Sequence, residues 1–217
     1  FFVSDLVDYY ANVEDDKVDE LLKAKDLLSE GYKLAPQSNF QQAQFKFEAT
    51  KTLYIKTANR QEEKIAKYWI AFCLADVGNI VESKTILDNL LFESEQKKYK
   101  WLVMLTATRL GDLAFRQNEH SQAIKFAKSA FNLAKEIEDT MYQQRSIVSI
   151  SFYYDILSDS SKSILYLSKL FDIKDLYFQG YFQHLRNLGG LFDKFKALEF
   201  LKSSIDYAKE FKSVAQE

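Results

Sequence analysis

The chain has 217 residues and a formal net charge of -2, from 29 Lys and Arg against 31 Asp and Glu. This balance argues against a nucleic-acid surface, which needs clustered Lys and Arg without compensating acids. A 47% hydrophobic content is enough for a continuous core, while 6 Gly and 1 Pro leave little room for β-hairpins or long ordered loops. No run of about 18 apolar residues is present, so we expect no membrane span.

In chain order, the first expected element is a short helix or cap over residues 1–17. From Val18 to Leu34 apolar residues recur at helical spacing, and Pro36 ends that helix. A second helix follows, and the helix-turn-helix pattern then repeats. The expected units span residues 18–57, 60–98, 100–138, 141–174 and 176–212, followed by a tail at 213–217. Beyond the first unit, helices are expected at 65–77, 80–91, 100–116, 120–137, 145–157, 161–171, 176–191 and 194–211.

Small residues recur along these units with a period of 40. Two helices cross closely only where side chains are small, so each pair of small residues predicts the point at which the helices of one unit meet. Self-similarity at a fixed period of this length is the signature of a solenoid. Solenoids present an extended surface to a partner. The first small residues are Gly31, Ala71, Gly111 and Ser151, and the second set, 12 residues later, is Ala43, Ser83, Ala123 and Ser163.

These residues resemble the tetratricopeptide repeat family. The resemblance covers residues 18–212, with a spacing of 40 residues where the family unit has about 34. It implies an all-α, right-handed α-solenoid of about five repeats, of the long-unit type found in bacterial signalling proteins. The matching positions are Leu110-Gly111, Ala123 and Ala130 in the third unit, and Ile70-Ala71, Leu74, Gly78 and Ser83 in the second.

The family resemblance also implies a partner-binding face, because the first helix of each unit lines a concave groove in this family. Aromatic rings beside alternating Asp and Arg suit an extended peptide or a partner helix. The alternative is that Phe72, Phe115 and Phe152 belong to the core between units. The expected face carries Tyr32, Tyr68, Phe72, Asp76, Thr108, Asp112, Phe115, Arg116, Phe152, Asp155, Phe182 and Arg186.

The chain carries no constellation that meets the requirements for catalysis, so we expect a non-enzymatic protein without cofactor or metal. His120 and His184 are the two histidines and lie far apart in sequence, which disfavours a metal site. Cys73 stands on a helix that the pattern buries, which is typical of a small core residue. As the single cysteine it cannot form an intramolecular disulfide, and we expect a cytoplasmic protein.

These features together predict a protein-interaction scaffold that binds a peptide or a partner helix in the groove. We expect it to be a regulatory region of a larger protein, in which another domain of the same chain is a further candidate partner. A second hypothesis is a ligand-gated sensor, in which a signalling peptide or small molecule changes the pitch of the array and controls an attached effector domain. A third is self-association through Phe2, Tyr9 and Tyr10.

Overall fold

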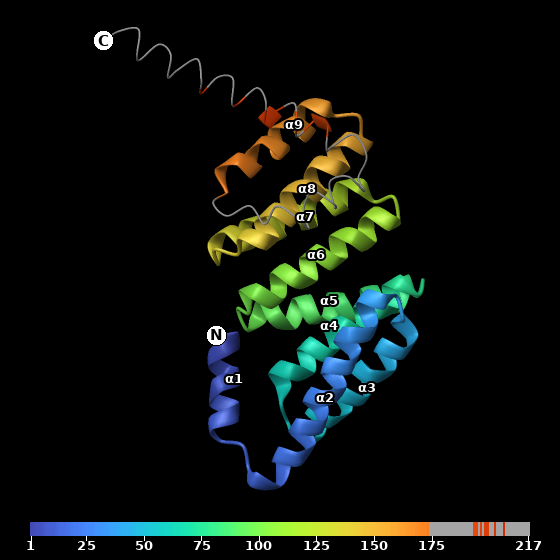
Figure 1. Ribbon diagram of the computed structural model, residues 1–217, viewed down its shortest axis with the longest axis vertical. Coiled ribbons are helices and arrows are strands. Elements are labelled where there is room, and N and C mark those ends of the chain that lie inside the picture. The colour runs from blue at the N-terminus through green and yellow to red at the C-terminus, as the bar shows by residue number, and fades with distance from the viewer. Residues whose placement is uncertain (174–192, 195, 197, 200–201, 203–205, 207–217) are drawn as a thin grey trace, which may run out of the picture. The chain divides into compact units, whose positions relative to one another are not determined.

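The computed structural model describes residues 1–173, together with residues 193–194, 196, 198–199, 202 and 206. Within residues 1–173 all regular structure is helical (Figure 1), which confirms the all-α prediction. Three short 3-10 helices are η1 (Asp15–Lys17), η2 (Ala35–Gln37) and η3 (Lys169–Asp172). The α-helices are α1 (Phe2–Ala11), α2 (Val18–Leu34), α3 (Phe40–Lys56), α4 (Arg60–Asp76), α5 (Ile80–Gln96), α6 (Lys100–Arg116), α7 (His120–Glu136), α8 (Thr140–Ile156) and α9 (Ser160–Ser168).

The chain forms two compact units, residues 1–119 with α1 to α6 and residues 120–217 with α7 to α9. In the first unit each helix from α2 to α5 packs on the next one in sequence, and in the second α8 packs on both α7 and α9. The boundary between the two units falls inside the segment 100–138, which the sequence predicts as one repeat. The predicted fifth repeat, 176–212, lies outside the described residues except at a few positions.

Helices and turns alternate with a period of 20 residues. The helices α3 to α8 have 17 residues each, and three residues separate each helix from the next. One residue in each turn has a positive φ, between 56° and 91°, and reverses the chain direction. Two such periods give the 40-residue repeat of the sequence. The left-handed residues are Ser38, Ala58, Gly78, Lys98, Asn118, Glu138 and Ser158.

The turns are closed by recurring backbone hydrogen bonds. After α3, the Asn59 N–H donates to the carbonyl of Tyr54 at 2.8 Å, which satisfies a carbonyl that the helix end leaves without a partner. Asn59 then begins α4, because its side-chain oxygen accepts from the N–H of Glu62 at 3.1 Å. Asp139 and Asp159 begin α8 and α9 in the same way. One short turn therefore ends one helix and starts the next.

The bounds of α2 and α6 are those that the sequence predicts, whereas several other helices begin earlier. α4 begins at Arg60 instead of residue 65, and α8 begins at Thr140 instead of residue 145. Both helices start directly after a residue whose side chain caps them. The first turn of α4 is polar, so its apolar periodicity starts more than one turn after the helix itself.

Small residues of the 40-residue repeat lie at close contacts between α2 and α3, between α4 and α5, and between α8 and α9. Gly31 of α2 faces Phe47 of α3, and a methyl group at residue 31 would lie 2.4 Å from the Phe47 ring. In the next pair of helices, the hydroxyl of Ser83 donates to the carbonyl of Ala71 at 2.7 Å. Between α8 and α9 the direction is reversed, because the hydroxyl of Ser151 on the first helix donates to the carbonyl of Ser163 on the second at 2.8 Å. Close approach and buried serine hydrogen bonds thus hold successive helices together.

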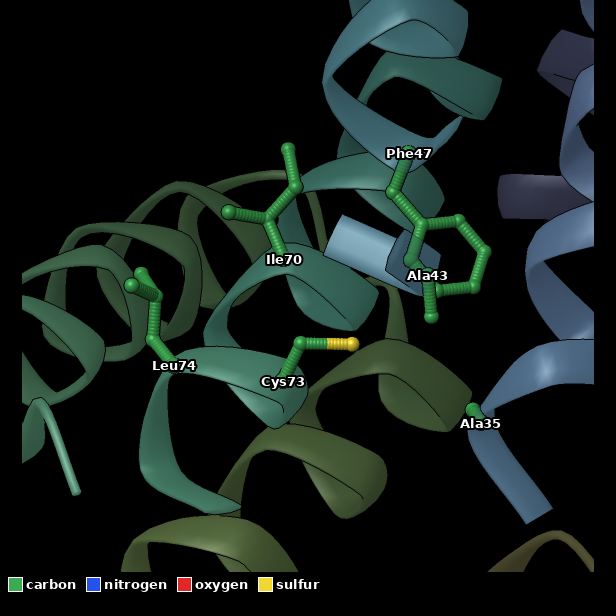
Figure 2. Close-up of a cluster of buried hydrophobic side chains, with 6 residues drawn as sticks. All are labelled: Ala35, Ala43, Phe47, Ile70, Cys73 and Leu74. Atoms are coloured by element: carbon green, nitrogen blue, oxygen red, sulfur yellow. The ribbon is translucent and has the colours of Figure 1, made fainter. Parts of the chain in front are cut away.

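A buried apolar cluster lies among η2, α3 and α4, and Figure 2 shows its six residues. Phe47 and Cys73 have no exposed surface, and Ile70 has 1%. Burial raises the pKa of the Cys73 thiol to about 12, so the thiol stays protonated at neutral pH. The prediction that Cys73 is a core residue is confirmed.

Helix α1 lies along the N-terminal ends of α4 and α6 (Figure 1). The hydroxyls of Tyr9 and Tyr10 donate to a carbonyl of the α3–α4 turn at 2.8 Å and to Glu62 at 2.5 Å. At the other end of α1, Phe2 packs edge-to-face on Tyr99, with ring centroids 5.1 Å apart. No residue of α1 is fully buried. The aromatic residues considered for self-association therefore make contacts within the chain.

Candidate partner-binding face

The predicted face residues that the structure describes lie on α2, α4, α6 and α8. In residues 1–119, Tyr32 lies on α2. In the second unit, Phe152 and Asp155 lie on α8. Phe182 and Arg186 lie outside the described residues. Helix α4 carries Tyr68, Phe72 and Asp76, and α6 carries Thr108, Asp112, Phe115 and Arg116.

An aromatic row joins α2 to α4. The ring centroid of Trp69 lies 5.1 Å from that of Tyr32 and 5.2 Å from that of Phe72. Trp69 also stacks on Phe47, with centroids 5.7 Å apart and an angle of 25° between the planes. Each such pair contributes roughly 0.5–1.5 kcal/mol beyond the area it buries. Because Tyr32 remains 38% exposed, the row reaches from the core to the surface.

The aromatic row continues into a charged cluster between α4 and α6. The guanidinium of Arg109 lies 4.1 Å from the centroid of the Phe72 ring. It donates to the Phe72 carbonyl at 3.0 Å and to Oδ2 of Asp76 at 2.8 Å. Arg116 donates to the other carboxylate oxygen of Asp76 at 2.6 Å, and Asp112 lies 3.8 Å from Arg109. We call this set the aromatic–arginine face: Tyr32, Trp69, Phe72, Asp76, Arg109, Asp112 and Arg116.

The two arginines of this face differ in exposure. The Arg109 side chain is 5% exposed, and its Nε has no hydrogen-bond partner among the described residues. The Arg116 side chain is 43% exposed. Removing one partner of a buried ion pair leaves an uncompensated charge, which is strongly destabilising. Arg109 and Asp76 therefore fix the packing of α6 on α4, while Arg116 presents a positioned guanidinium at the surface.

Tyr32, at the other end of the face, keeps its proton at physiological pH. Burial raises the pKa of Tyr32 to about 12, an effect that hydrogen bonding with Trp69 partly offsets. A neutral phenol can both donate and accept a hydrogen bond. The exposed edge of Tyr32 therefore offers an apolar ring and a polar group at the same point of the face.

Two residues predicted for the face have little surface. Tyr68 is 8% exposed and Thr108 is 7% exposed. The hydroxyl of Thr108 donates to the carbonyl of Met104 on its own helix, at 2.8 Å. Phe115 is half-buried. The side chains of Tyr68 and Thr108 therefore offer little surface to a partner.

Trp69 and Arg109, which join the predicted residues to one another, were not among the residues predicted from the sequence. Trp69 stands three residues before Phe72 and therefore shares its helix face, a spacing that could have identified it. Arg109 interrupts a largely apolar helix, and a charge in such a position indicates a buried ion pair. Its partner Asp76 is 33 residues away, so the sequence alone does not show the pairing.

In the second unit, Phe152 packs against a buried cluster that includes Ile147, Val148, Leu167 and Leu170. Asp155 forms an ion pair with Lys194. Phe152 is therefore partly buried against residues of α8, α9 and η3. The carboxylate of Asp155 already has a cationic partner within its own unit.

A cleft of about 410 Å³ lies among α3, α4 and α5. Its lysines are paired on their own helices, Lys51 with Glu48 and Lys67 with Glu63. These glutamates offset the positive charge of the cleft. Phe92 at this cleft is 64% exposed. The cleft is lined by Lys51, Lys67, Ile70, Ile86, Asn89, Leu90, Phe92 and Glu93.

In the described part of the chain, no three His, Cys, Asp or Glu side chains are grouped so that they could hold a metal ion. None of the helices that the structure describes is long and apolar enough to cross a membrane.

Comparison with solved structures identifies the fold. The crystal structure of the apo form of RapI matches 99% of this chain with a TM-score of 0.66 and 15% sequence identity. The chain is an all-α helical-repeat solenoid. It spans 61% of the length of the RapI chain. No family model matches the sequence, and no curated protein matches it. The likeness supports a repeat fold of the tetratricopeptide type, whereas membership of that family stays a prediction.

Proposed function

We propose that the aromatic–arginine face binds a peptide or a helix of a partner protein, and that the chain is a non-catalytic interaction scaffold. The observation that carries the proposal is the continuous row from Tyr32 to Arg116. Both end residues are exposed, at 38% for Tyr32 and 43% for the Arg116 side chain. The residues between them are held by ring packing and ion pairs.

The chemistry of the face suits a polypeptide. Trp, Tyr and Arg are enriched among the residues that contribute most to protein interfaces. A guanidinium carries five N–H donors. In Arg116, one terminal nitrogen donates to the carbonyl of Ala75 and the other donates to the carboxylate of Asp76. The remaining donors can bind a carbonyl or carboxylate of a ligand. Because the side chains are already held in place, binding costs less conformational entropy.

Selection from a random peptide display library against the full chain tests this proposal. Selected peptides are then titrated against wild type, Arg116→Ala and Tyr32→Ala by fluorescence anisotropy. Loss of one main contact at an interface costs more than about 1 kcal/mol, so we expect affinity to fall roughly tenfold in each variant.

Phe92→Ala provides the matched control, because it removes an exposed aromatic side chain from α5, away from the face. We expect this variant to bind the selected peptides as wild type does. Peptides that bind all four proteins equally, or that are lost only with Phe92→Ala, would refute the proposed site.

A further inference from the structure

A second surface, rich in Lys and Tyr, lies within residues 120–173. Tyr154 of α8 and Tyr166 of α9 stack with ring centroids 5.8 Å apart and an angle of 26° between their planes. Lys128 of α7 donates to the Tyr154 hydroxyl at 2.9 Å. Its ammonium lies 5.3 Å from the centroid of the Tyr154 ring and 5.4 Å from that of Tyr166. Three helices thus bring one cation and two rings together.

Two further lysines lie over the same rings. The Lys162 ammonium is 5.4 Å from the centroid of Tyr154, and that of Lys169 is 5.6 Å from the centroid of Tyr166. A cation within about 6 Å of a ring is attracted by the electrons of the ring face. These contacts gather three positive charges on two rings and restrict where the lysine side chains point. We call the five residues the lysine–tyrosine surface: Lys128, Tyr154, Lys162, Tyr166 and Lys169.

The positive charge of this surface is largely uncompensated. Lys162 is paired with Asp159 at 2.7 Å. In the part of the chain that the structure describes, neither Lys128 nor Lys169 lies within ion-pair distance of a carboxylate. The surface therefore carries local positive charge in a chain whose net charge is -2. It attracts an anionic group from outside these residues.

Apolar side chains are also exposed on α9, the short helix that carries Lys162 and Tyr166. Ile164 is 40% exposed and Leu165 is 58% exposed, and both lie between Lys162 and Lys169. Residues three or four apart lie on one face of a helix, so Lys162 and Leu165 are neighbours on the surface of α9. A ligand that uses both features carries carboxylates as well as apolar groups.

We propose that the lysine–tyrosine surface binds an acidic peptide segment of a partner protein, one whose Asp or Glu side chains are interspersed with apolar residues. Carboxylates pair with the ammonium groups of Lys128 and Lys169, and apolar side chains lie on Leu165. A single-stranded nucleic acid fits less well, because such ligands stack bases on free aromatic faces. Here the two rings stack on one another and carry lysines.

The test measures binding of a fluorescein-labelled peptide of four Glu-Glu-Leu repeats to the full chain by anisotropy. The variant Lys128→Gln/Lys162→Gln/Lys169→Gln removes the three charges. The control variant Lys23→Gln/Lys33→Gln/Lys97→Gln removes three exposed lysines from residues 1–119, with the same change in net charge. We expect the control to bind within twofold of wild type and the first variant to bind at least tenfold more weakly.

Three further measurements sharpen the result. A Gln-Gln-Leu peptide is expected not to bind, and the Glu-Glu-Leu affinity is expected to fall as salt is raised. Arg116→Ala is expected to bind the acidic peptide as wild type does, which separates this surface from the aromatic–arginine face. If the triple variant melts below wild type, Lys169→Gln alone replaces it, because this lysine has no carboxylate within ion-pair distance among the described residues; a threefold loss is then expected.

Equal binding by the two triple variants would overturn the proposal, since it would show attraction to net charge alone. No binding of the acidic peptide to wild type at low salt would also overturn it. So would tighter binding of a single-stranded oligonucleotide of equal charge, if the lysine–tyrosine variant abolished it.

Discussion

At the scale of single residues, the turns repeat one backbone conformation with different residue types. Seven residues spaced 20 apart have positive φ, and only Gly78 among them is a glycine. An L-residue in this conformation costs roughly 1–2 kcal/mol, because its Cβ approaches the following carbonyl oxygen. The hydrogen bonds that close each turn, such as that from Asn59 to Tyr54, offset this cost. The turns are therefore positions at which stability can be changed in either direction.

Lys98→Gly and Gly78→Ala form a matched pair that tests this account. Lys98 has φ 56° and is exposed, so Lys98→Gly relieves the backbone and should raise the free energy of unfolding by about 1 kcal/mol. Gly78 has φ 91° and open space around a Cβ, so Gly78→Ala should lower it by about 1 kcal/mol. Urea unfolding measures both changes, and shifts of the same sign would contradict the account.

Gly31 is constrained by space instead of backbone conformation. A Cβ there would lie 2.4–2.9 Å from three atoms of the Phe47 ring, which is fully buried. Gly31→Ala should therefore destabilise the protein by about 1–3 kcal/mol in urea unfolding, although alanine is the better helix former. In a Phe47→Leu background the same change should be neutral or stabilising, and an equal cost in both backgrounds would show that the ring is not the cause.

At the scale of helices, α4 and α6 are joined by the ion pair of Asp76 with Arg109 and Arg116. Asp76→Ala leaves the buried Arg109 without its hydrogen-bonded carboxylate, with only Asp112 at 3.8 Å, and we expect a loss of about 3–5 kcal/mol. Arg116→Ala removes a pair with one exposed partner and should cost less than about 1 kcal/mol. Thermal or urea unfolding distinguishes the two variants, and equal costs would refute the buried role of Arg109.

Helix α1 is held differently from the others. It has no fully buried residue, and the hydroxyls of Tyr9 and Tyr10 anchor its C-terminal end. We expect amide hydrogens of α1 to exchange much faster than those of α4, because local opening of α1 exposes little apolar surface. Tyr9→Phe/Tyr10→Phe should accelerate exchange in α1 further and leave α4 unchanged. Protection of α1 equal to that of α4 would contradict this.

At the scale of the whole molecule, the helical repeat was predictable because it depends on the spacing of residues that are near one another in sequence. Small residues 40 apart and apolar periodicity predict the helices, and α2 and α6 have the predicted bounds. The earlier start of α4 was missed because its first turn is polar and its signal is a cap, Asn59. Periodicity detects buried faces more readily than helix ends.

The candidate face was predictable only in part. Tyr32, Phe72, Asp76, Asp112 and Arg116 are linked through two residues that the sequence analysis did not name. Trp69 and Arg109 link α2 to α4 and α4 to α6, and these contacts depend on how helices far apart in sequence pack. Family resemblance gives the helix that bears the face, whereas the contacts decide which side chains remain at the surface.

We propose above that the aromatic–arginine face binds a partner polypeptide. Site-specific photo-crosslinking tests it most directly, with a benzophenone amino acid placed at Tyr32 or, as the comparison, at Phe92 in the full chain. After irradiation in a native lysate, mass spectrometry identifies crosslinked peptides. The account predicts a crosslinked partner from residue 32 that Arg116→Ala abolishes, with none from residue 92. The same partner crosslinked from residue 92 alone would contradict it.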